Sequence, residues 1–246
     1  HAITLGFDSF IGTPDDEVPL AAEVAQLYGA RHTVRRVGQA EFEQDLPAIL
    51  DAMDQPSIDG VNTWFVAKAA REAGLKVALS GLGGDEMLAG YPSFIDIPRM
   101  VNTFAPFRAL PFFGTAARYI IDSTGASRNR PKMAGLLELG GSFPGAYLLR
   151  RSLFLPSELP RLLGRELAIE GLARLDAFGL LAASLEPDPG SSVGRVSALE
   201  CGAYTRNQLL RDADWAGMAH TIEIRTPLLD IGFLRAVAPT LRAMRN

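Results

Sequence analysis

The chain has 246 residues, of which 48% are hydrophobic and 21% are charged, and its formal net charge is −4. This is the composition of a globular protein with room for one large domain, and the absence of a basic run argues against a nucleic-acid-binding surface, which needs clustered Lys and Arg. The single cysteine, Cys201, excludes an internal disulfide and a cysteine-rich zinc site, and no apolar run reaches the roughly 18 residues that span a membrane.

Residues 2–80 alternate between strand and helix patterns. Short apolar or β-branched runs predict strands at Ile3–Phe7, His32–Val37 and Lys76–Ser80. Apolar periodicity predicts helices at Glu17–Tyr28, Glu41–Met53 and Asn62–Ala73, the last preceded by Asp59 as a candidate cap. Strands separated by helices predict an α/β fold with a parallel sheet covered on both faces. Ligands of such sheets bind beyond the carboxyl ends of the strands.

From about Asp96 the pattern changes to helical stretches broken by Pro and Gly, with a loop over 186–192 and a last helix over Ser197–Met218. We therefore divide the chain into a partial α/β core, 1–96, and a mainly helical part, 97–246. A chain that opens without Met inside a strand pattern is expected to be a fragment.

Several charged and aromatic residues of the predicted helices are interpreted as structural and not as functional residues. A charged run on the last helix is predicted to form a solvated face with local ion pairs, and a role facing a ligand cleft is the alternative; it comprises Arg206, Arg211, Asp212 and Asp214. Trp64 and Trp215 are predicted core residues. His220, at a helix end, is expected to be packed or capping rather than a base.

The most informative stretch follows the third predicted strand and reads Ser80-Gly81-Leu82-Gly83-Gly84-Asp85-Glu86. Glycines let a backbone approach a ligand closely and direct amide groups at it. Two acids beside a phosphate are reasonable if Mg²⁺ bridges them. The alternative is a Gly-rich turn whose acids stabilise the start of the next helix.

Four segments, in order along the chain, resemble the asparagine synthase family. They are Leu5-Gly6-Phe7-Asp8, the Asp-x-Pro segment within 53–63, the run Ser80 to Tyr91 with its Gly90-Tyr91 end, and Met218-Ala219-His220-Thr221-Ile222-Glu223-Ile224-Arg225-Thr226-Pro227-Leu228-Leu229-Asp230. The resemblance implies a partial sheet of the adenine-nucleotide alpha-hydrolase (PP-loop) type. It also implies an ATP-dependent carbon–nitrogen ligase in which ATP adenylates a carboxylate substrate and ammonia from a glutaminase domain attacks the acyl-adenylate.

The resemblance also assigns roles by position. Leu5 is expected to line the adenine pocket, Ser80, Gly81, Gly83 and Gly84 to contact the nucleotide, and Asp85 to hold Mg²⁺ and pyrophosphate. Asp59, Asn62 and Thr63 are expected near the acceptor. Glu86, Glu223 and Arg225 are candidates for substrate contact or for bracing the loop. We expect a cytoplasmic location and a small-molecule carboxylate substrate, with a homodimer as an open alternative.

The sequence departs from the family in three places. The phosphate loop Ser-Gly-Gly-x-Asp-Ser and the loop lysine do not occur in this chain, so the catalytic residues are unknown and the chain alone is expected to be inactive. In the family an acid often follows Ser-Gly, where this chain has Leu82. The acceptor is therefore open, and the alternatives are a sugar acid, a peptide, a β-amino acid, or a non-catalytic binding or regulatory relative.

Overall fold

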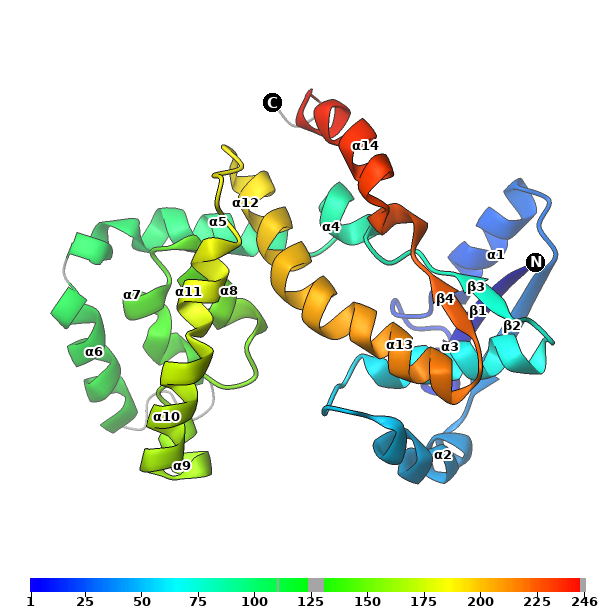
Figure 1. The fold of residues 1–246 in the computed structure, drawn as a ribbon, viewed down its shortest axis with the longest axis horizontal. Coiled ribbons are helices and arrows are strands. Elements are labelled where there is room, and N and C mark those ends of the chain that lie inside the picture. Colours follow the sequence, from blue (N-terminus) through cyan, green and yellow to red (C-terminus); the bar gives the residue numbers. More distant parts are fainter. Residues whose placement is uncertain (110, 124–130, 244–246) are drawn as a thin grey trace. The chain divides into compact units, whose positions relative to one another are not determined.

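The computed structural model describes residues 1–109, 111–123 and 131–243, and these form a mixed α/β structure with many helices and four short strands (Figure 1). Their α-helices and strands are β1 (Ala2–Phe7), α1 (Val18–Leu27), β2 (His32–Val37), α2 (Gln39–Ala52), α3 (Gly60–Glu72), β3 (Val77–Leu79), α4 (Gly84–Leu88), α5 (Ser93–Phe104), α6 (Pro111–Ser123), α7 (Leu136–Leu139), α8 (Phe143–Arg151), α9 (Leu159–Leu163), α10 (Arg165–Leu175), α11 (Ala177–Ala183), α12 (Ser192–Leu199), α13 (Leu210–Ala219), β4 (Glu223–Arg225) and α14 (Ile231–Ala243). A π-helical segment, Glu200–Leu209, connects α12 to α13, and short 3₁₀ turns lie at 8–10, 105–109, 131–135 and 227–229.

The chain forms two compact units. Unit 1 contains residues 1–82 and 205–246, and unit 2 contains residues 83–204. The division of the sequence at residue 96 stays a prediction about domain organisation. No helix in the described part of the chain has the length and apolarity that a membrane crossing requires.

Unit 1 contains all four strands, arranged as two parallel pairs. β1 pairs with β2 from Ala2–His32 to Phe7–Val37, and β3 pairs with β4 from Val77–Glu223 to Leu79–Arg225. The parallel pairing is therefore confirmed for the first two predicted strands, whereas the third pairs in parallel with β4. Within the described residues the strands form two separate pairs, so the expectation of a single sheet is wrong. The partner of β3 is a three-residue strand that comes much later in the sequence and carries two charges, so no apolar run marks it as a strand.

Helix α3 begins two residues earlier than predicted, and Asp59 does not cap it. The Asp59 side chain accepts no hydrogen bond from the first turn. The Gly60 amide instead donates to the Ser57 hydroxyl at 3.2 Å, and the Asp59 carboxylate accepts a 2.7 Å hydrogen bond from Gln208. A carboxylate at this position is thus used for a long-range contact, which the local capping pattern does not reveal.

Helices α3 and α13 pack together below the strands and share an apolar core (Figure 1). Its buried members are Val37, Ile49, Trp64, Phe65, Trp215 and Ala216. The two tryptophan rings lie 6.3 Å apart, so both are core residues, as predicted. Since this core joins helices from both ends of the chain, it fixes β4 beside β3.

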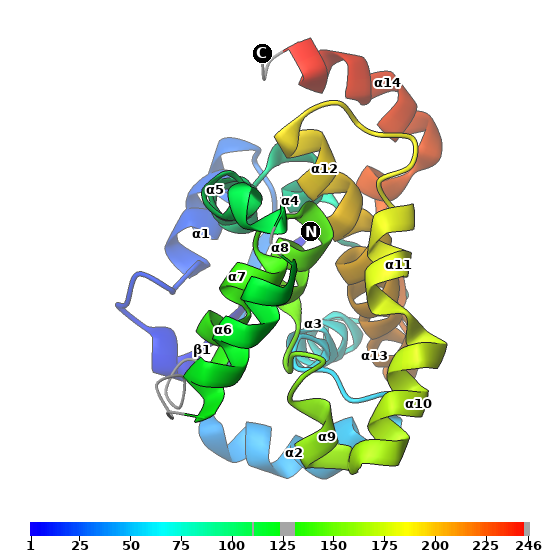
Figure 2. The same ribbon diagram turned by 90° about the vertical axis from the view of Figure 1, so that its left-hand side faces the viewer.

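Unit 2 is helical, and its core lies between α5, α8, α11 and α12 (Figure 2). The apolar members are Phe94, Ile97, Ala146, Tyr147, Leu181, Val196 and Leu199. The predicted single helix over Ser197–Met218 is wrong in one respect. The chain adopts π-helical geometry from Glu200 to Leu209, which helical periodicity alone does not predict, and such segments frequently occur at functional sites.

Candidate functional site

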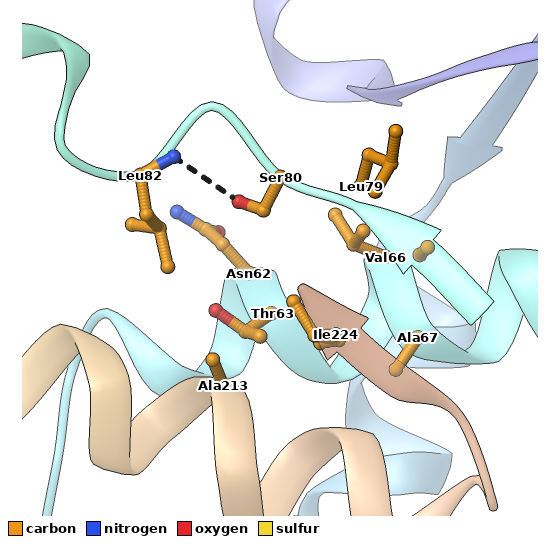
Figure 3. A pocket seen from close by; sticks show the side chains of 10 residues that line it. Asn62, Thr63, Val66, Ala67, Leu79, Ser80, Leu82, Ala213 and Ile224 are labelled. Atoms are coloured by element: carbon orange, nitrogen blue, oxygen red, sulfur yellow. Dashed lines mark hydrogen bonds between the residues drawn. The ribbon is translucent and has the colours of Figure 1, made fainter. Parts of the chain in front are cut away.

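A pocket of about 160 Å³ lies in unit 1 beside the carboxyl end of β3 (Figure 3). It is lined by Asn62, Thr63, Val66, Ala67, Ala78, Leu79, Ser80, Leu82, Ala213 and Ile224. Each of the three longer motif segments contributes to it: Asn62 and Thr63 come from the first, Ser80 and Leu82 from the second, and Ile224 from the third. Ligands of parallel sheets bind at this end of a strand, so the position is the one expected for the site.

The backbone at the end of β3 is held by two hydrogen bonds. The Ser80 amide donates to the Arg225 carbonyl at 2.8 Å, which extends the β3–β4 pairing by one residue. The Leu82 amide donates to the Ser80 hydroxyl at 3.3 Å, and this bond closes the turn around Gly81 (Figure 3). A Cβ added at Gly81 would meet no atom within 4 Å, so open space in front of this backbone leaves room for a ligand.

The segment that leads to Asn62 and Thr63 is fastened to α13 and to the π-helical segment before it. The Ser57 hydroxyl donates to Asp212 Oδ2 at 2.5 Å, and Trp215 Nε1 donates to Asp212 Oδ1 at 2.9 Å. Gln208 binds Asp59, as described above. These bonds fix the first turn of α3, from which Asn62 and Thr63 reach the pocket.

The prediction of a solvated face on the last helix is wrong for Asp212, which is buried. It is 1% exposed, whereas Arg206 and Asp214 are exposed. Arg211 reaches the same motif segment, since it hydrogen-bonds Gln55 and lies 3.5 Å from Asp54. One signal could have identified Asp212: Trp215 and Ala216 follow it by three and four positions, which places all three on one helix face.

Gly60 is a position where the packing requires a glycine. A Cβ at this residue would lie 2.3 Å from Trp215 Cζ2 and 3.1 Å from Asp212 Oδ1. Helix α3 therefore approaches α13 too closely for any side chain here.

The acidic part of the glycine-rich motif belongs to unit 2. Gly83 has φ of 96°, a left-handed conformation that favours glycine, and α4 follows from Gly84. The Asp85 carboxylate is exposed in the first turn of this short helix. Its Oδ1 lies 1.9 Å from where a Cβ of Gly90 would be, so the glycine at the end of the motif makes room for Asp85.

Glu86 points the other way, into the interior of unit 2, where it is 1% exposed and accepts a 3.2 Å hydrogen bond from the Tyr91 hydroxyl. Burial, reinforced by the charge of Glu86, raises the pKa of Tyr91, so the phenol keeps its proton as donor. Of the two roles considered for Glu86, this arrangement favours bracing the loop.

A second buried carboxylate, Glu200, continues this network. It is fully buried and accepts hydrogen bonds from Ser93 (2.5 Å), Tyr147 (3.1 Å) and Arg151 (3.0 Å). The Arg151 guanidinium also lies over the Tyr91 ring, 4.7 Å from its centroid. Cys201 follows Glu200 in the π-helical segment, and burial raises the pKa of its thiol to about 11, so the thiol is protonated at neutral pH.

The remaining predicted residues lie elsewhere in unit 1. Leu5 is partly buried and packs against the apolar core of α3 and α13, and it does not line the pocket. Glu223 and Arg225 form a 2.8 Å ion pair on the exposed side of β4. The two charged side chains share one face of the strand, because alternate residues of a strand project to the same side, and they point away from the pocket-lining Ile224.

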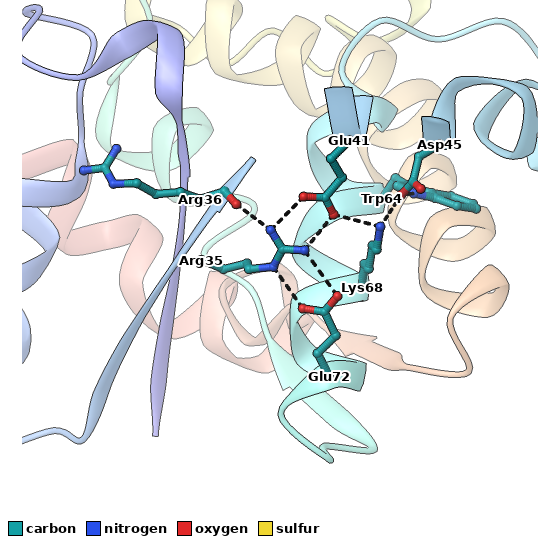
Figure 4. A network of polar contacts seen from close by, with 7 residues as sticks. All are labelled: Arg35, Arg36, Glu41, Asp45, Trp64, Lys68 and Glu72. Atoms are coloured by element: carbon teal, nitrogen blue, oxygen red, sulfur yellow. Dashed lines mark hydrogen bonds and ion pairs between the residues drawn. The ribbon is translucent and has the colours of Figure 1, made fainter. Parts of the chain in front are cut away.

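A polar network on the other side of α3 ties β2 to the helices (Figure 4). Arg35 contacts Glu41 at 2.6 Å and Glu72 at 2.9 Å, and Lys68 contacts Asp45 at 2.6 Å. The hydrogen bond from Arg35, aided by Lys68, holds the pKa of Glu41 at about 2. Burial acts to lower the pKa of Lys68, but its bonds to Asp45 and Glu41 outweigh that effect and raise it. The network is structural, since none of its members lines the pocket.

His220 is a packed residue, as predicted. Its ring lies 4.3 Å from Trp64 in an edge-to-face arrangement, it is 7% exposed, and its Nε2 has no hydrogen-bond partner. Burial, together with the nearby charges of Arg71 and Lys68, lowers its pKa, so the imidazole is neutral.

The described residues contain no cluster of three or more His, Cys, Asp or Glu side chains with the geometry of a metal site. Mg²⁺ does not need one, because it usually takes one or two carboxylates and completes its shell with water and phosphate oxygens. The exposed Asp85 carboxylate fits the part of a single protein ligand.

Comparison with known proteins identifies the family of the chain. The family model for asparagine synthase matches residues 1–243. A Mycobacterium tuberculosis (strain ATCC 25618 / H37Rv) protein named "Putative asparagine synthetase (glutamine-hydrolyzing)" is 29% identical over 230 residues, which cover 87% of this chain and 32% of the relative. Bacillus subtilis (strain 168) "Asparagine synthetase (glutamine-hydrolyzing) 1" is 26% identical over 217 residues, which cover 87% of this chain and 33% of the relative. The chain thus spans about a third of the length of these relatives. No solved structure matches significantly.

Proposed function

The chain belongs to the asparagine synthase family, and from this premise we propose that it is the carboxylate-activating part of an ATP-dependent amide ligase. In this reaction a carboxylate oxygen of the acceptor attacks the α-phosphorus of ATP and pyrophosphate leaves. Ammonia then attacks the acyl carbon, AMP leaves, and the nitrogen loses a proton. The nucleotide-binding fold proposed for this chain is of the PP-loop type.

One observation carries the proposal. The three longer motif segments of the family resemblance, which are far apart in the sequence, contribute side chains to a single pocket at the end of β3. A chance likeness in sequence would not be expected to bring Asn62, Ser80 and Ile224 to one cavity.

The described residues would have distinct tasks. We propose that Ser80 and Gly81 present hydroxyl and backbone groups to the nucleotide and that Gly83 and Gly84 allow the close approach of phosphates. Asp85 would hold Mg²⁺, which supplies positive charge beside the leaving pyrophosphate. Asn62 and Thr63 would position the acceptor, because much of the rate gain in such a step comes from orientation.

The proposal also covers the source of ammonia, the location and the oligomeric state. Ammonia is proposed to come from a glutaminase domain, the location is proposed to be cytoplasmic, and a homodimer is a further proposal. The described chain alone is proposed to be inactive. The sequence Ser-Gly-Gly-x-Asp-Ser does not occur among its 246 residues.

The test is pyrophosphate release by the full-length gene product with ATP, Mg²⁺ and glutamine, measured across a panel of carboxylates. Release that depends on aspartate, with asparagine formed, supports asparagine synthesis. Release with another acid supports the same chemistry on a different acceptor, which is the second candidate favoured by Leu82. No release with any acid contradicts the ligase proposal and supports a non-catalytic relative.

A further inference from the structure

Among the residues that the structure describes, none that lines the pocket at the end of β3 is charged, and this restricts what the pocket can bind. Seven of its ten lining side chains are apolar, and the other three, Asn62, Thr63 and Ser80, are polar but neutral. We propose that the pocket receives an uncharged, ring-sized group of the acceptor carboxylate, so that the acceptor is not an amino acid with a free ammonium group beside Leu82. This inference rests on the proposed function, since it names the substrate class of the same site.

A charged group would be poorly solvated in this pocket. An ammonium group that enters the pocket would lose part of its water, and an unpaired charge in an apolar environment carries a large penalty. No lining residue offers a carboxylate in return. Leu82 occupies the motif position at which the family often has an acid, and its half-buried side chain adds apolar surface instead.

The volume also limits the occupant. At about 160 Å³, the pocket is close to the roughly 150 Å³ of an apolar cavity that accommodates benzene. An aromatic ring or a branched aliphatic group of that size would fill it. The acid group of the same molecule would remain outside, near the exposed Asn62.

An adenine ring is also uncharged and of similar size, so the nucleotide is the competing source of the group. Leu5, the residue expected to line the adenine pocket, packs against the apolar core instead and does not reach this cavity. Two residues expected near the acceptor, Asn62 and Thr63, line it, and so does one residue expected at the nucleotide, Ser80, at the mouth of the turn that leads to Gly81. The placement of these residues favours the acceptor.

The experiment measures binding to the 246-residue chain without ATP, with 3-phenylpropanoate, L-aspartate and adenosine as the probes in calorimetric titrations. Leu82→Glu places a carboxylate in the pocket, and Leu20→Glu makes the same change at an exposed position of α1 outside it (66% exposed). Circular dichroism confirms that both variants are folded. We expect 3-phenylpropanoate to bind the wild type and Leu20→Glu equally, with affinity for Leu82→Glu reduced about tenfold or more, because its ring would meet a charge.

Several binding results with the two acids would overturn the inference. They are tighter binding of L-aspartate than of 3-phenylpropanoate, equal binding of 3-phenylpropanoate to the wild type and Leu82→Glu, and no binding of either acid. Displacement of 3-phenylpropanoate by adenosine, with the same dependence on Leu82, would assign the pocket to a nucleobase and also overturn it.

Pyrophosphate release by the full-length product separates this inference from the proposed function. Release with aspartate alone would overturn the inference and leave the ligase standing. Binding of 3-phenylpropanoate that depends on Leu82, with no pyrophosphate release from any acid, would contradict the ligase proposal. The inference that the pocket binds an uncharged group would still stand.

Discussion

The Ser57 hydroxyl and the Asp212 carboxylate are 155 positions apart in the sequence and are joined by a hydrogen bond of 2.5 Å. Asp212 is almost fully buried, and its other oxygen is held by the Trp215 indole. Ser57 belongs to the motif segment within 53–63, and Asp212 lies just before the motif segment that begins at Met218. The bond is the most direct link between the acceptor side of the pocket and α13.

Asp212→Ala is expected to lower the free energy of unfolding by about 3 kcal/mol, because it leaves two buried or half-buried donors, on Ser57 and Trp215, without their acceptor. Tryptophan fluorescence during urea unfolding measures this, since both tryptophans of the chain lie in unit 1. Asp214→Ala, at an exposed position of the same helix, is the matched control and should change stability by less than about 0.5 kcal/mol. Equal effects of the two variants would contradict the assigned role of Asp212.

Gly60→Ala is expected to destabilise unit 1 by about 2 kcal/mol, because the added methyl group would overlap the Trp215 ring. Gly81→Ala serves as control, since no atom lies within 4 Å of its added Cβ. Thermal unfolding followed at 222 nm compares the two variants with the wild type. A Gly60→Ala chain as stable as Gly81→Ala would show that the helices do not approach as closely as described.

Glu41→Gln is expected to lower stability at pH 7 by about 2 kcal/mol, because hydrogen bonds between charged groups contribute more than neutral ones. The folded-state pKa of about 2 lies below the unfolded value of 4.5. The contribution of Glu41 is therefore present above about pH 4.5 and is lost as the pH falls towards 2. Urea unfolding of the wild type and the variant should converge over that range, and Glu43→Gln, at an exposed position of the same helix, should match the wild type throughout.

His220 is expected to make unit 1 less stable in mild acid. Its folded-state pKa is lowered from 6.5, so below about pH 6.5 the unfolded chain binds a proton that the folded chain does not, and stability falls as the pH falls. One proton gives a slope of at most about 1.4 kcal/mol per pH unit. In unfolding measured between pH 5.5 and 7.5, His220→Gln should lose this part of the slope, and an unchanged slope would argue against a neutral, buried imidazole.

Features of unit 1 with a local cause could be predicted from the sequence. The strand at His32–Val37 has the predicted bounds, and the strand at Ala2–Phe7 differs by one residue, because continuous apolar or β-branched runs have few other good conformations. The position of Ser80 and Leu82 at the end of a strand follows from the same local reading. Trp64 and Trp215 are core residues for a simple reason of size and apolarity.

Features that depend on distant partners could not be predicted. Asp59 and Asp212 are acids whose local sequence suits a cap and a solvated face, yet their carboxylates are used by Gln208 and Ser57. The pairing of β4 with β3 joins two segments that lie far apart in the sequence, and nothing local to Glu223 and Arg225 indicates that partner. The π-helical geometry begins at Glu200, whose buried carboxylate accepts four hydrogen bonds from Ser93, Tyr147 and Arg151. These donors come from other helices of unit 2, so the sequence around Glu200 does not reveal them.

The pairing of the strands two by two has a consequence for hydrogen exchange. Within the described residues each strand has a single neighbour, and an isolated pair of strands is only marginally stable. Amide protons of β1 and β3 should therefore exchange through small local openings, while those of α3 and α13, on either side of the tryptophan pair, should wait for unit 1 to unfold as a whole. Measured residue by residue, amide exchange in unit 1 would be faster in the strands than in the helices. For a wide parallel sheet the opposite order is expected.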